Sequence, residues 1–171
     1  MRLFFALWPP TATCSALAGW AAQAHLLTGG RLTRTDSIHL TLAFLGEVAE
    51  ERVEDAIRAA RSVRGAHHSL PIERAKVWAH NNIAWVGPEQ TPSALDSLAE
   101  SLRMQLAAGG FTIEERPFVA HITLIRKART VSRLPPLPAL DWPVDEFTLV
   151  RSRLSPRGSS YEIVARFGLG D

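Results

Sequence analysis

The sequence contains very little cysteine and lysine, and each shortage narrows what the protein can be. Cys14 is the only cysteine, so neither an intramolecular disulfide nor a cysteine-based metal site can form. Lys76 and Lys127 are the only lysines among 19 basic residues, so arginine carries almost all of the positive charge. The planar guanidinium matches the oxygens of a phosphate group. The composition is therefore compatible with a phosphate-bearing ligand, although a genome that favours arginine codons gives the same result.

Long apolar runs and runs of like charge are also missing. No apolar run approaches the ~20 residues that a membrane span needs, and no charge block indicates a nucleic-acid-binding tail. The start MRLFFALWPP has some features of a secretion signal, but Pro9 and Pro10 end its apolar patch early. With 46% hydrophobic and 21% charged residues, the chain is typical of a globular protein. We expect a cytoplasmic protein, with residues 1–171 forming one domain of two lobes.

The pattern of apolar residues favours an α+β fold with mostly antiparallel sheet. Helical spacing and capping residues predict helices over 11–30, 47–63 and 91–110, with Thr91 as the cap of the last. Strand patterns cover 2–8, 31–33, 38–46, a hairpin of 70–80 and 83–87, two strands within 111–128, and a closing pair of 144–154 and 161–169. The proline-rich stretch 131–143 predicts an irregular loop.

Two of the apolar stretches carry a histidine followed two residues later by a threonine. They read IHLTLAFLG and VAHITLIRK. Side chains of a strand alternate between its two faces, so His39 and Thr41 share one face. His121 and Thr123 share a face in the same way. Each strand therefore has an apolar side to bury and a side that presents an imidazole beside a hydroxyl.

The second copy of the motif changes how the first is interpreted. A single His-x-Thr strand is most often a structural pair, satisfied and partly buried. Two imidazoles that face one cavity can divide acid and base work, because histidine titrates near neutral pH. The neighbouring hydroxyls can donate hydrogen bonds to ligand oxygens. If the two strands meet, the pattern predicts a site for a tetrahedral anion between two halves of the chain.

These motifs resemble the paired His-x-Thr signatures of the 2H phosphoesterase superfamily, and most closely its LigT-like branch, the RNA 2′,3′-cyclic phosphodiesterases. The resemblance covers nearly the whole chain. MRLFFALWPP, DSIHLTLAFLGEV, GGFTIEERPFVAHITLIR and LVRSRLSPRGSSYEIVARFGL are similar to the opening strand, the two motifs and the closing hairpin. The chain departs at Ala120, where the branch commonly has proline, and at WPP, where LP is more usual.

The resemblance implies a bilobal α+β fold with two mostly antiparallel sheets, pseudo-twofold symmetry around a central cleft, and helices on the outer faces. The implied reaction opens a 2′,3′-cyclic phosphate on RNA or a nucleotide to a 2′-phosphate, with no metal or other cofactor. His121 would be the base that activates water, and His39 the acid that protonates the departing 3′ oxygen. Thr41 and Thr123 would hold the non-bridging phosphoryl oxygens.

Arg126 is a further candidate for substrate binding, because the family often has an arginine three residues after the second motif threonine. Strict alternation from Thr123 instead places Arg126 on the opposite face, together with Ile122 and Leu124. A bend in the strand is therefore needed for Arg126 to reach the cleft.

Three alternatives to this hydrolase remain open at the level of sequence. They are an RNA 2′–5′ ligase in the same cleft, a non-catalytic RNA or nucleotide binder, and a histidine-ligated metallohydrolase. The expected partners are RNA ends or nucleotides with a cyclic phosphate, with no membrane and no obligate protein partner, and the chain is expected to be a monomer.

Other residues attract attention but are expected to have structural roles. His67 and His68 lie in a predicted solvated loop without further metal ligands nearby in the sequence. Asp36 could orient the first motif histidine, but it lies in a turn signal. Unresolved candidates for the wall of the cleft are Phe5, Trp78, Trp85 and Tyr161.

Overall fold

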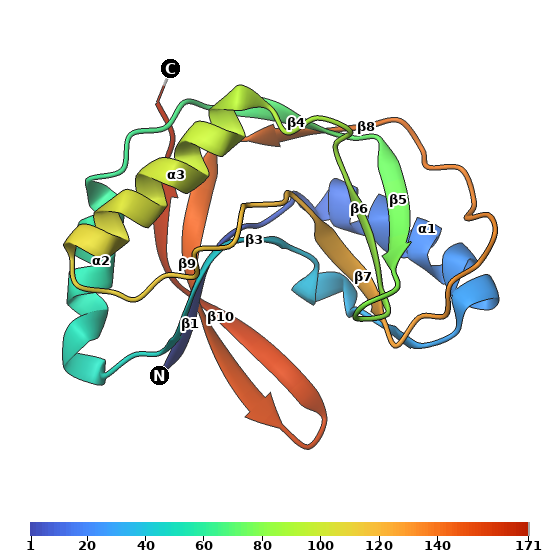
Figure 1. Ribbon diagram of the computed structural model, residues 1–171, viewed down its shortest axis with the longest axis horizontal. Helices are drawn as coiled ribbons and strands as arrows, with labels where there is room; N and C mark the ends of the chain where they lie inside the picture. Colours follow the sequence, from blue (N-terminus) through green and yellow to red (C-terminus); the bar gives the residue numbers. More distant parts are fainter. Residues whose placement is uncertain (171) are drawn as a thin grey trace.

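The computed structural model describes residues 1–170 and contains two antiparallel sheets (Figure 1). One half of the eight-stranded sheet has the order β10-β9-β1-β3, formed by Gly158–Gly168, Glu146–Ser155, Arg2–Leu7 and Leu40–Glu47. The other half has the order β7-β6-β5, formed by Ile122–Arg126, Ile83–Gly87 and Arg74–Trp78, with β2 (Arg31–Leu32) beside β7. The predicted α+β, mostly antiparallel fold is confirmed.

The helices pack on the outside of these two halves. Figure 1 places α1 (Thr11–Thr28) against the half that contains β6 and β7. Helices α2 (Val53–Arg61) and α3 (Ser93–Ala108) pack on each other and cover the half that contains β1, β3 and β9. Within residues 1–170, no helix combines the length and the apolar character that a bilayer crossing requires.

The two halves of the large sheet are joined at one residue pair between β3 and β7. Leu40 pairs with Ile122 in antiparallel register, and this is the only pair recorded between the two strands. Both side chains are 0% exposed. We call Leu40 and Ile122 the joining pair. The two strands that carry the His-x-Thr motifs therefore meet, and each histidine lies one residue before its strand begins.

The two faces of the large sheet have different roles. Along β1, alternate side chains enter the main core with the helices: Leu3, Phe5 and Leu7. Phe4 and Ala6 point to the other face, where a small separate cluster forms. Phe5, an unresolved candidate for the wall of the cleft, is thus a core residue.

The structure corrects several predicted elements. The last helix begins at Ser93 after Pro92, and Thr91 does not cap it with its side chain. The expected strand before Pro117 is absent from the described residues, since 111–121 has no regular structure. Part of the proline-rich loop instead forms β8 (Leu140–Val144), which pairs with β4 (His68–Ile72) in a second sheet of two strands.

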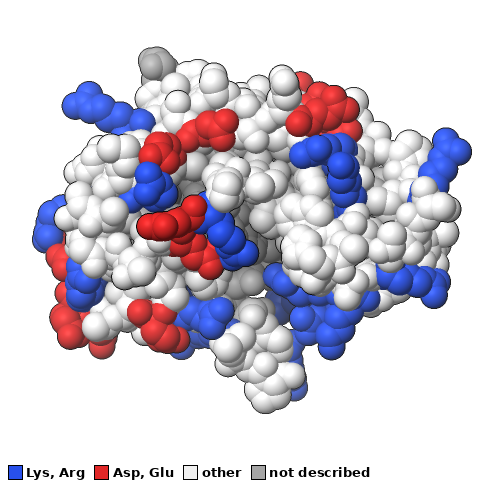
Figure 2. All heavy atoms as spheres, in the orientation of Figure 1, with Lys and Arg blue, Asp and Glu red and all other residues white. Residues whose placement is uncertain are grey.

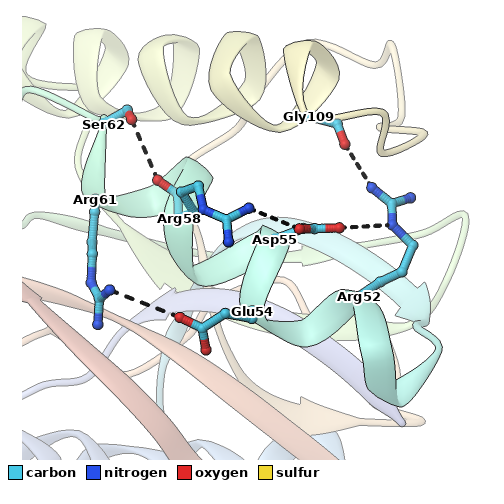
Figure 3. A network of polar contacts seen from close by, with 7 residues as sticks. All are labelled: Arg52, Glu54, Asp55, Arg58, Arg61, Ser62 and Gly109. Atoms are coloured by element: carbon cyan, nitrogen blue, oxygen red, sulfur yellow. Dashed lines mark hydrogen bonds and ion pairs between the residues drawn. The ribbon is translucent and has the colours of Figure 1, made fainter.

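A polar network ties the start of α2 to the end of α3 (Figure 3). The Arg52 guanidinium donates to the carbonyl oxygen of Gly109 at 2.6 Å and to the Asp55 carboxylate at 3.3 Å. The same guanidinium lies 4.3 Å from the ring centre of Phe111. Although exposed ion pairs contribute little to stability, these contacts hold the segment that leads from α3 toward His121.

The joining pair gives a test of how the halves of the sheet depend on each other. Truncation of the fully buried Leu40 to alanine is expected to destabilise the protein by about 2–5 kcal/mol, because it leaves a cavity between the halves. The matched change Leu154→Ala removes the same atoms from a side chain that is 73% exposed, and is expected to cost less than about 0.5 kcal/mol. Urea denaturation measures both, and equal losses would contradict the role given to Leu40.

Candidate active site

The four motif side chains come together around the joining pair. Extending the antiparallel register by one residue in each direction places His39 opposite Thr123. It also places Thr41 opposite His121. The two histidines are then diagonal neighbours, with Cβ atoms roughly 7–8 Å apart or slightly less. We call the sheet surface that carries these four residues the histidine face.

Both histidines are held by the same backbone hydrogen bond. Nδ1 of His39 lies 2.7 Å from the carbonyl oxygen of Ser37, and Nδ1 of His121 lies 2.8 Å from that of Val119. Because a carbonyl oxygen only accepts, Nδ1 carries the proton in each ring. Each neutral imidazole therefore keeps Nε2 as a proton acceptor, which is the atom needed for a general base.

A β-bulge brings Arg126 to the histidine face. The register between β6 and β7 skips one residue of β7, Leu124, and such an extra residue shifts the alternation of the strand. Leu124 and Ile125 are consequently both buried, whereas Arg126 is exposed and returns to the face of Thr123. Its charge acts on both motif histidines. The bend that Arg126 needed is therefore present.

The first motif strand, β3, also contains a β-bulge after its threonine, but this bulge turns an aromatic residue to the histidine face. The register between β1 and β3 skips Leu42, and Leu42 and Ala43 are both buried. Phe44 then points to the histidine face, five residues after His39, as Arg126 stands five residues after His121. The Phe44 ring stacks on that of Phe4 at 5.7 Å. Sequence reasoning missed Phe44, although the two apolar residues after Thr41 interrupt alternation and could have indicated the bulge.

Aromatic rings enclose His39. The Trp8 ring stacks on the imidazole at 4.9 Å and 13°, because β1 continues past its last pair with β3 and places Trp8 opposite the histidine. Phe4 and Tyr161 contact the same imidazole at 5.1 and 5.2 Å. Tyr161 therefore lines the site, as one of the sequence candidates, whereas Trp8 was not singled out from the sequence.

His121 has fewer aromatic neighbours. Trp78 of β5 lies 4.8 Å from the imidazole at 60°, and Trp85 lies 6.2 Å away, edge on. The residue of β6 that lies opposite His121 is Gly87, by extension of the register. A side chain there would collide with the backbone of Ala120, whose oxygen lies 2.7 Å from the position of the added Cβ.

These surroundings lower the pKa values of both histidines. Burial lowers the pKa of His39 to about 4 from an ordinary 6.5, and the charges of Arg126 and His121 add to the effect. Burial also lowers the pKa of His121, and Arg126 lowers it further. In each case the backbone hydrogen bond at Nδ1 acts in the opposite direction. Both rings are therefore neutral near pH 7 in the protein alone, whereas the bound anion of a substrate would favour their protonation.

The hydroxyls of the motif threonines are available to a ligand. Within residues 1–170, neither Thr41 nor Thr123 uses its hydroxyl in a hydrogen bond to another protein group. The backbone oxygen of Thr123, by contrast, accepts from the Thr33 hydroxyl at 3.2 Å. The histidine face thus offers two imidazole nitrogens and two hydroxyls around one point.

The remaining sequence candidates lie elsewhere or have other partners. His68 begins β4 and pairs with Val144, so it belongs to a sheet, and the prediction of a solvated loop was wrong there. The Asp36 carboxylate binds the Arg34 guanidinium at 2.7 Å and accepts from the Ser37 hydroxyl at 3.3 Å, whereas the ring of His39 is held by the backbone oxygen of Ser37. Among the described residues, no three histidine, cysteine or acidic side chains are grouped to hold a metal ion.

The fold and the paired motifs define a phosphoesterase of the 2H type. The family model for LigT like phosphoesterases matches the chain twice, over residues 7–85 and 86–161, and each match contains one His-x-Thr motif. The chain belongs to this family, as the resemblance in the sequence implied. The two matches divide the chain along the sequence, and each contains strands from both halves of the large sheet.

Individual relatives cover almost the full length. An RNA 2′,3′-cyclic phosphodiesterase of Escherichia coli (strain K12) is 36% identical over 170 residues, which make up 98% of this chain and 96% of the relative. One of Thermus thermophilus is 33% identical, covering 99% of this chain and 90% of the relative. The crystal structure of E. coli LigT complexed with 3′-AMP superimposes with a TM-score of 0.92 at 34% identity, covering 99% of this chain and 98% of the other.

The stack of Trp8 on His39 predicts a measurable pKa change. Trp8→Leu opens one side of the ring to water, so the pKa of His39 is expected to rise from about 4 toward its ordinary 6.5. NMR titration of the imidazole protons measures it. The matched variant Trp78→Leu is expected to raise the pKa of His121 and to change His39 far less. An unaltered His39 titration in Trp8→Leu would rule out the stack as the cause.

Proposed function

We propose that the protein hydrolyses 2′,3′-cyclic phosphates at the ends of RNA or on nucleotides, to 2′-phosphates and without a metal ion. The observation that carries the proposal is the diagonal arrangement of His39 and His121 across the joining pair, with a threonine hydroxyl opposite each. The relatives support it, since several at 32–36% identity are RNA 2′,3′-cyclic phosphodiesterases.

The diagonal suits displacement at phosphorus, in which the entering and leaving oxygens lie roughly in line. With the phosphorus between the rings, Nε2 of His121 takes a proton from water as the water oxygen attacks. The bond from phosphorus to O3′ breaks, and Nε2–H of His39 gives its proton to O3′. The phosphate remains on O2′. General base and general acid each typically contribute 10²–10⁴-fold in rate.

The two motif threonines lie on the other diagonal of the histidine face and bind the non-bridging oxygens of the phosphate. Thr41 and Thr123 donate hydrogen bonds to them, and Arg126 adds a positive charge from the same face. Fixed donors of this kind stabilise the negative charge that develops in the transition state. These groups supply the charge stabilisation for which other phosphoesterases use metal ions, so the mechanism requires none.

The negative charge of the substrate favours the protonated form of His39, which the mechanism needs as its general acid. His39 has to be protonated to act, yet burial lowers its pKa to about 4 in the protein alone. A cyclic phosphate carries one negative charge, and an opposite charge within a few ångströms favours the protonated imidazole. Substrate binding and protonation of His39 are therefore linked in this mechanism.

A cytoplasmic location and a monomeric state stay predictions.

The direct test is hydrolysis of a 2′,3′-cyclic nucleotide in the presence of EDTA. The wild type is expected to retain its full rate with the chelator, whereas His39→Ala and His121→Ala should each lose at least about 10²-fold in kcat. His68→Gln, a histidine change in the second sheet, serves as the matched control and should keep the wild-type rate. Loss of activity in EDTA would indicate a metallohydrolase, and binding without turnover would indicate a non-catalytic binder.

The pH dependence follows from the lowered pKa values. Catalysis needs one protonated and one neutral imidazole, and in the protein alone both pKa values lie below 6.5. Above that pH the fraction of singly protonated pairs falls about tenfold per pH unit. We expect kcat/KM, which reports the free enzyme, to decline from pH 6.5 to 8. In contrast, kcat should hold to higher pH, because the bound anion raises both pKa values. A flat kcat/KM profile over this range would contradict the scheme.

A further inference from the structure

The four motif residues do not by themselves decide which ester oxygen of the substrate leaves. A 2′,3′-cyclic phosphate presents two similar oxygens, O2′ and O3′, in one ring at phosphorus. Turning the ribose over exchanges these oxygens and keeps the phosphorus between His39 and His121. The same turn exchanges the base, which is attached on the O2′ side, with C5′ and O5′, which are attached on the O3′ side. A contact to one of these outer groups is therefore needed to fix the product.

Tyr161 lies beside His39, the proposed acid. Its ring centre lies 5.2 Å from that of the imidazole at 77°. The same ring meets those of Phe4 and Trp8 edge on, at 5.3 and 5.9 Å. In the proposed reaction O3′ lies against Nε2 of His39, so the ribose atoms on that side, C4′, C5′ and O5′, come next to this wall.

The Tyr161 hydroxyl is free to bind a ligand. Within residues 1–170 it takes part in no hydrogen bond, and its oxygen is not buried. A tyrosine that is packed among other rings usually has a partner for its hydroxyl. Here the hydroxyl is left for water or for a polar atom of the substrate.

The sheet fixes where Tyr161 stands. Its partner on β9 is Ser152, which is the last residue of β9 that pairs with β1, opposite Arg2. Figure 2 shows the β9–β10 hairpin projecting below the rest of the molecule, and Tyr161 lies at the root of this projection. Its ring packs on the small cluster around Phe4 on the histidine face. Packing of this kind holds a donor in one orientation, as a binding site requires.

The rings beside His121 do not offer an equivalent group. They are the indoles of Trp78 and Trp85. The indole nitrogen of Trp85 is buried and has no partner among the described residues, so a ligand does not reach it. In the proposed mechanism water enters on this side, whereas the ribose lies on the side of His39.

We propose that Tyr161 is a specificity-determining residue, whose hydroxyl donates a hydrogen bond to O5′ of the reacting nucleotide and so places O3′ against His39. In the reverse orientation O5′ loses this partner, and O2′ becomes the leaving oxygen. The inference rests on the proposed function, and it gives the reason for a 2′-phosphate product. O5′ is present both on a nucleotide with a free 5′-hydroxyl and on an RNA end, so both substrates carry the acceptor.

The first test is the ratio of 2′- to 3′-phosphate formed from adenosine 2′,3′-cyclic phosphate, measured by chromatography. The wild type should form the 2′-phosphate in excess, and Tyr161→Phe should lower the ratio roughly tenfold, the loss expected for one hydrogen bond. Phenylalanine keeps the ring, so the contacts around His39 remain. The matched control Ser152→Ala removes a hydroxyl from the residue opposite Tyr161, and should keep the wild-type ratio.

The second test removes the acceptor from the substrate. The 5′-deoxy analogue of adenosine 2′,3′-cyclic phosphate lacks O5′, so the wild type should lose roughly tenfold in product ratio with it. Tyr161→Phe should add no further loss with this analogue, because two changes to one contact are not additive. Losses that add in full overturn the assignment of O5′ as the partner of Tyr161.

A binding measurement separates this inference from the proposed hydrolysis. Because Tyr161 is the only tyrosine, a protein labelled with carbon-13 at tyrosine Cζ gives one NMR signal, which responds to hydrogen bonding of the hydroxyl. Adenosine 2′-phosphate should shift this signal, and the 5′-deoxy analogue of that nucleotide should leave it nearly in place.

The outcomes are distinct. Hydrolysis with equal product ratios in wild type and Tyr161→Phe overturns the role of Tyr161 and leaves the proposed function standing. Absence of hydrolysis, with a Tyr161 signal that depends on O5′, overturns the proposed function and leaves the contact standing. A 3′-phosphate as the main product of the wild type overturns both.

Discussion

The arrangement of the site depends on one antiparallel contact, the joining pair of Leu40 and Ile122. Because the side chains of a strand alternate, a slip of one residue would turn each motif to the opposite face. The burial of both leucine and isoleucine side chains opposes such a slip, since the neighbouring histidines would then have to enter the core. The polar site is thus positioned by an apolar contact that takes no part in the chemistry.

Around this contact the two halves share a backbone plan but differ in side chains. Each motif strand has a histidine held at Nδ1 by the carbonyl oxygen two residues earlier, and each has a bulge after its threonine. The rings of Trp8, Phe4 and Tyr161 surround His39, whereas those of Trp78 and Trp85 lie beside His121. After the bulge, the residue turned to the histidine face is Phe44 in one half and Arg126 in the other. Two equal halves would bind a ligand equally well in either direction. The difference in side chains gives the site a direction, and it also gives the two imidazoles different electrostatic surroundings.

The parts of the site that could be predicted from the sequence are those set by local alternation. His39 and Thr41, or His121 and Thr123, share a face because of strand geometry alone. Arg126 could not be placed in this way, since the bulge that turns it to the histidine face appears only in the pairing of β7 with β6.

Contacts that depend on register between distant segments were likewise hidden. The stack of Trp8 on His39 follows from how β1 pairs with β3. The second sheet was missed because residues 70–80 read as a single strand that contains Pro71, and because the proline-rich stretch that ends at Pro143 favoured a loop. Both strands of a two-stranded sheet are edges, however, and an edge tolerates proline. Thr91 failed as a cap because Pro92 itself takes the cap position.

Arginine and histidine side chains are concentrated on the histidine face, so the same anion that the site binds would also stabilise the folded protein. Arg126 lowers the pKa values of both histidines, and it lies opposite Arg31 without an acidic partner among the described residues. Each of these interactions is unfavourable in the protein alone, and an anion between the motifs relieves all of them together. A ligand that binds only the folded state stabilises it, so the anion that reacts would also be the counter-charge that the folded chain lacks. The same negative charge would favour protonation of His39. Recognition of the phosphate and preparation of the acid are, in this view, one electrostatic event.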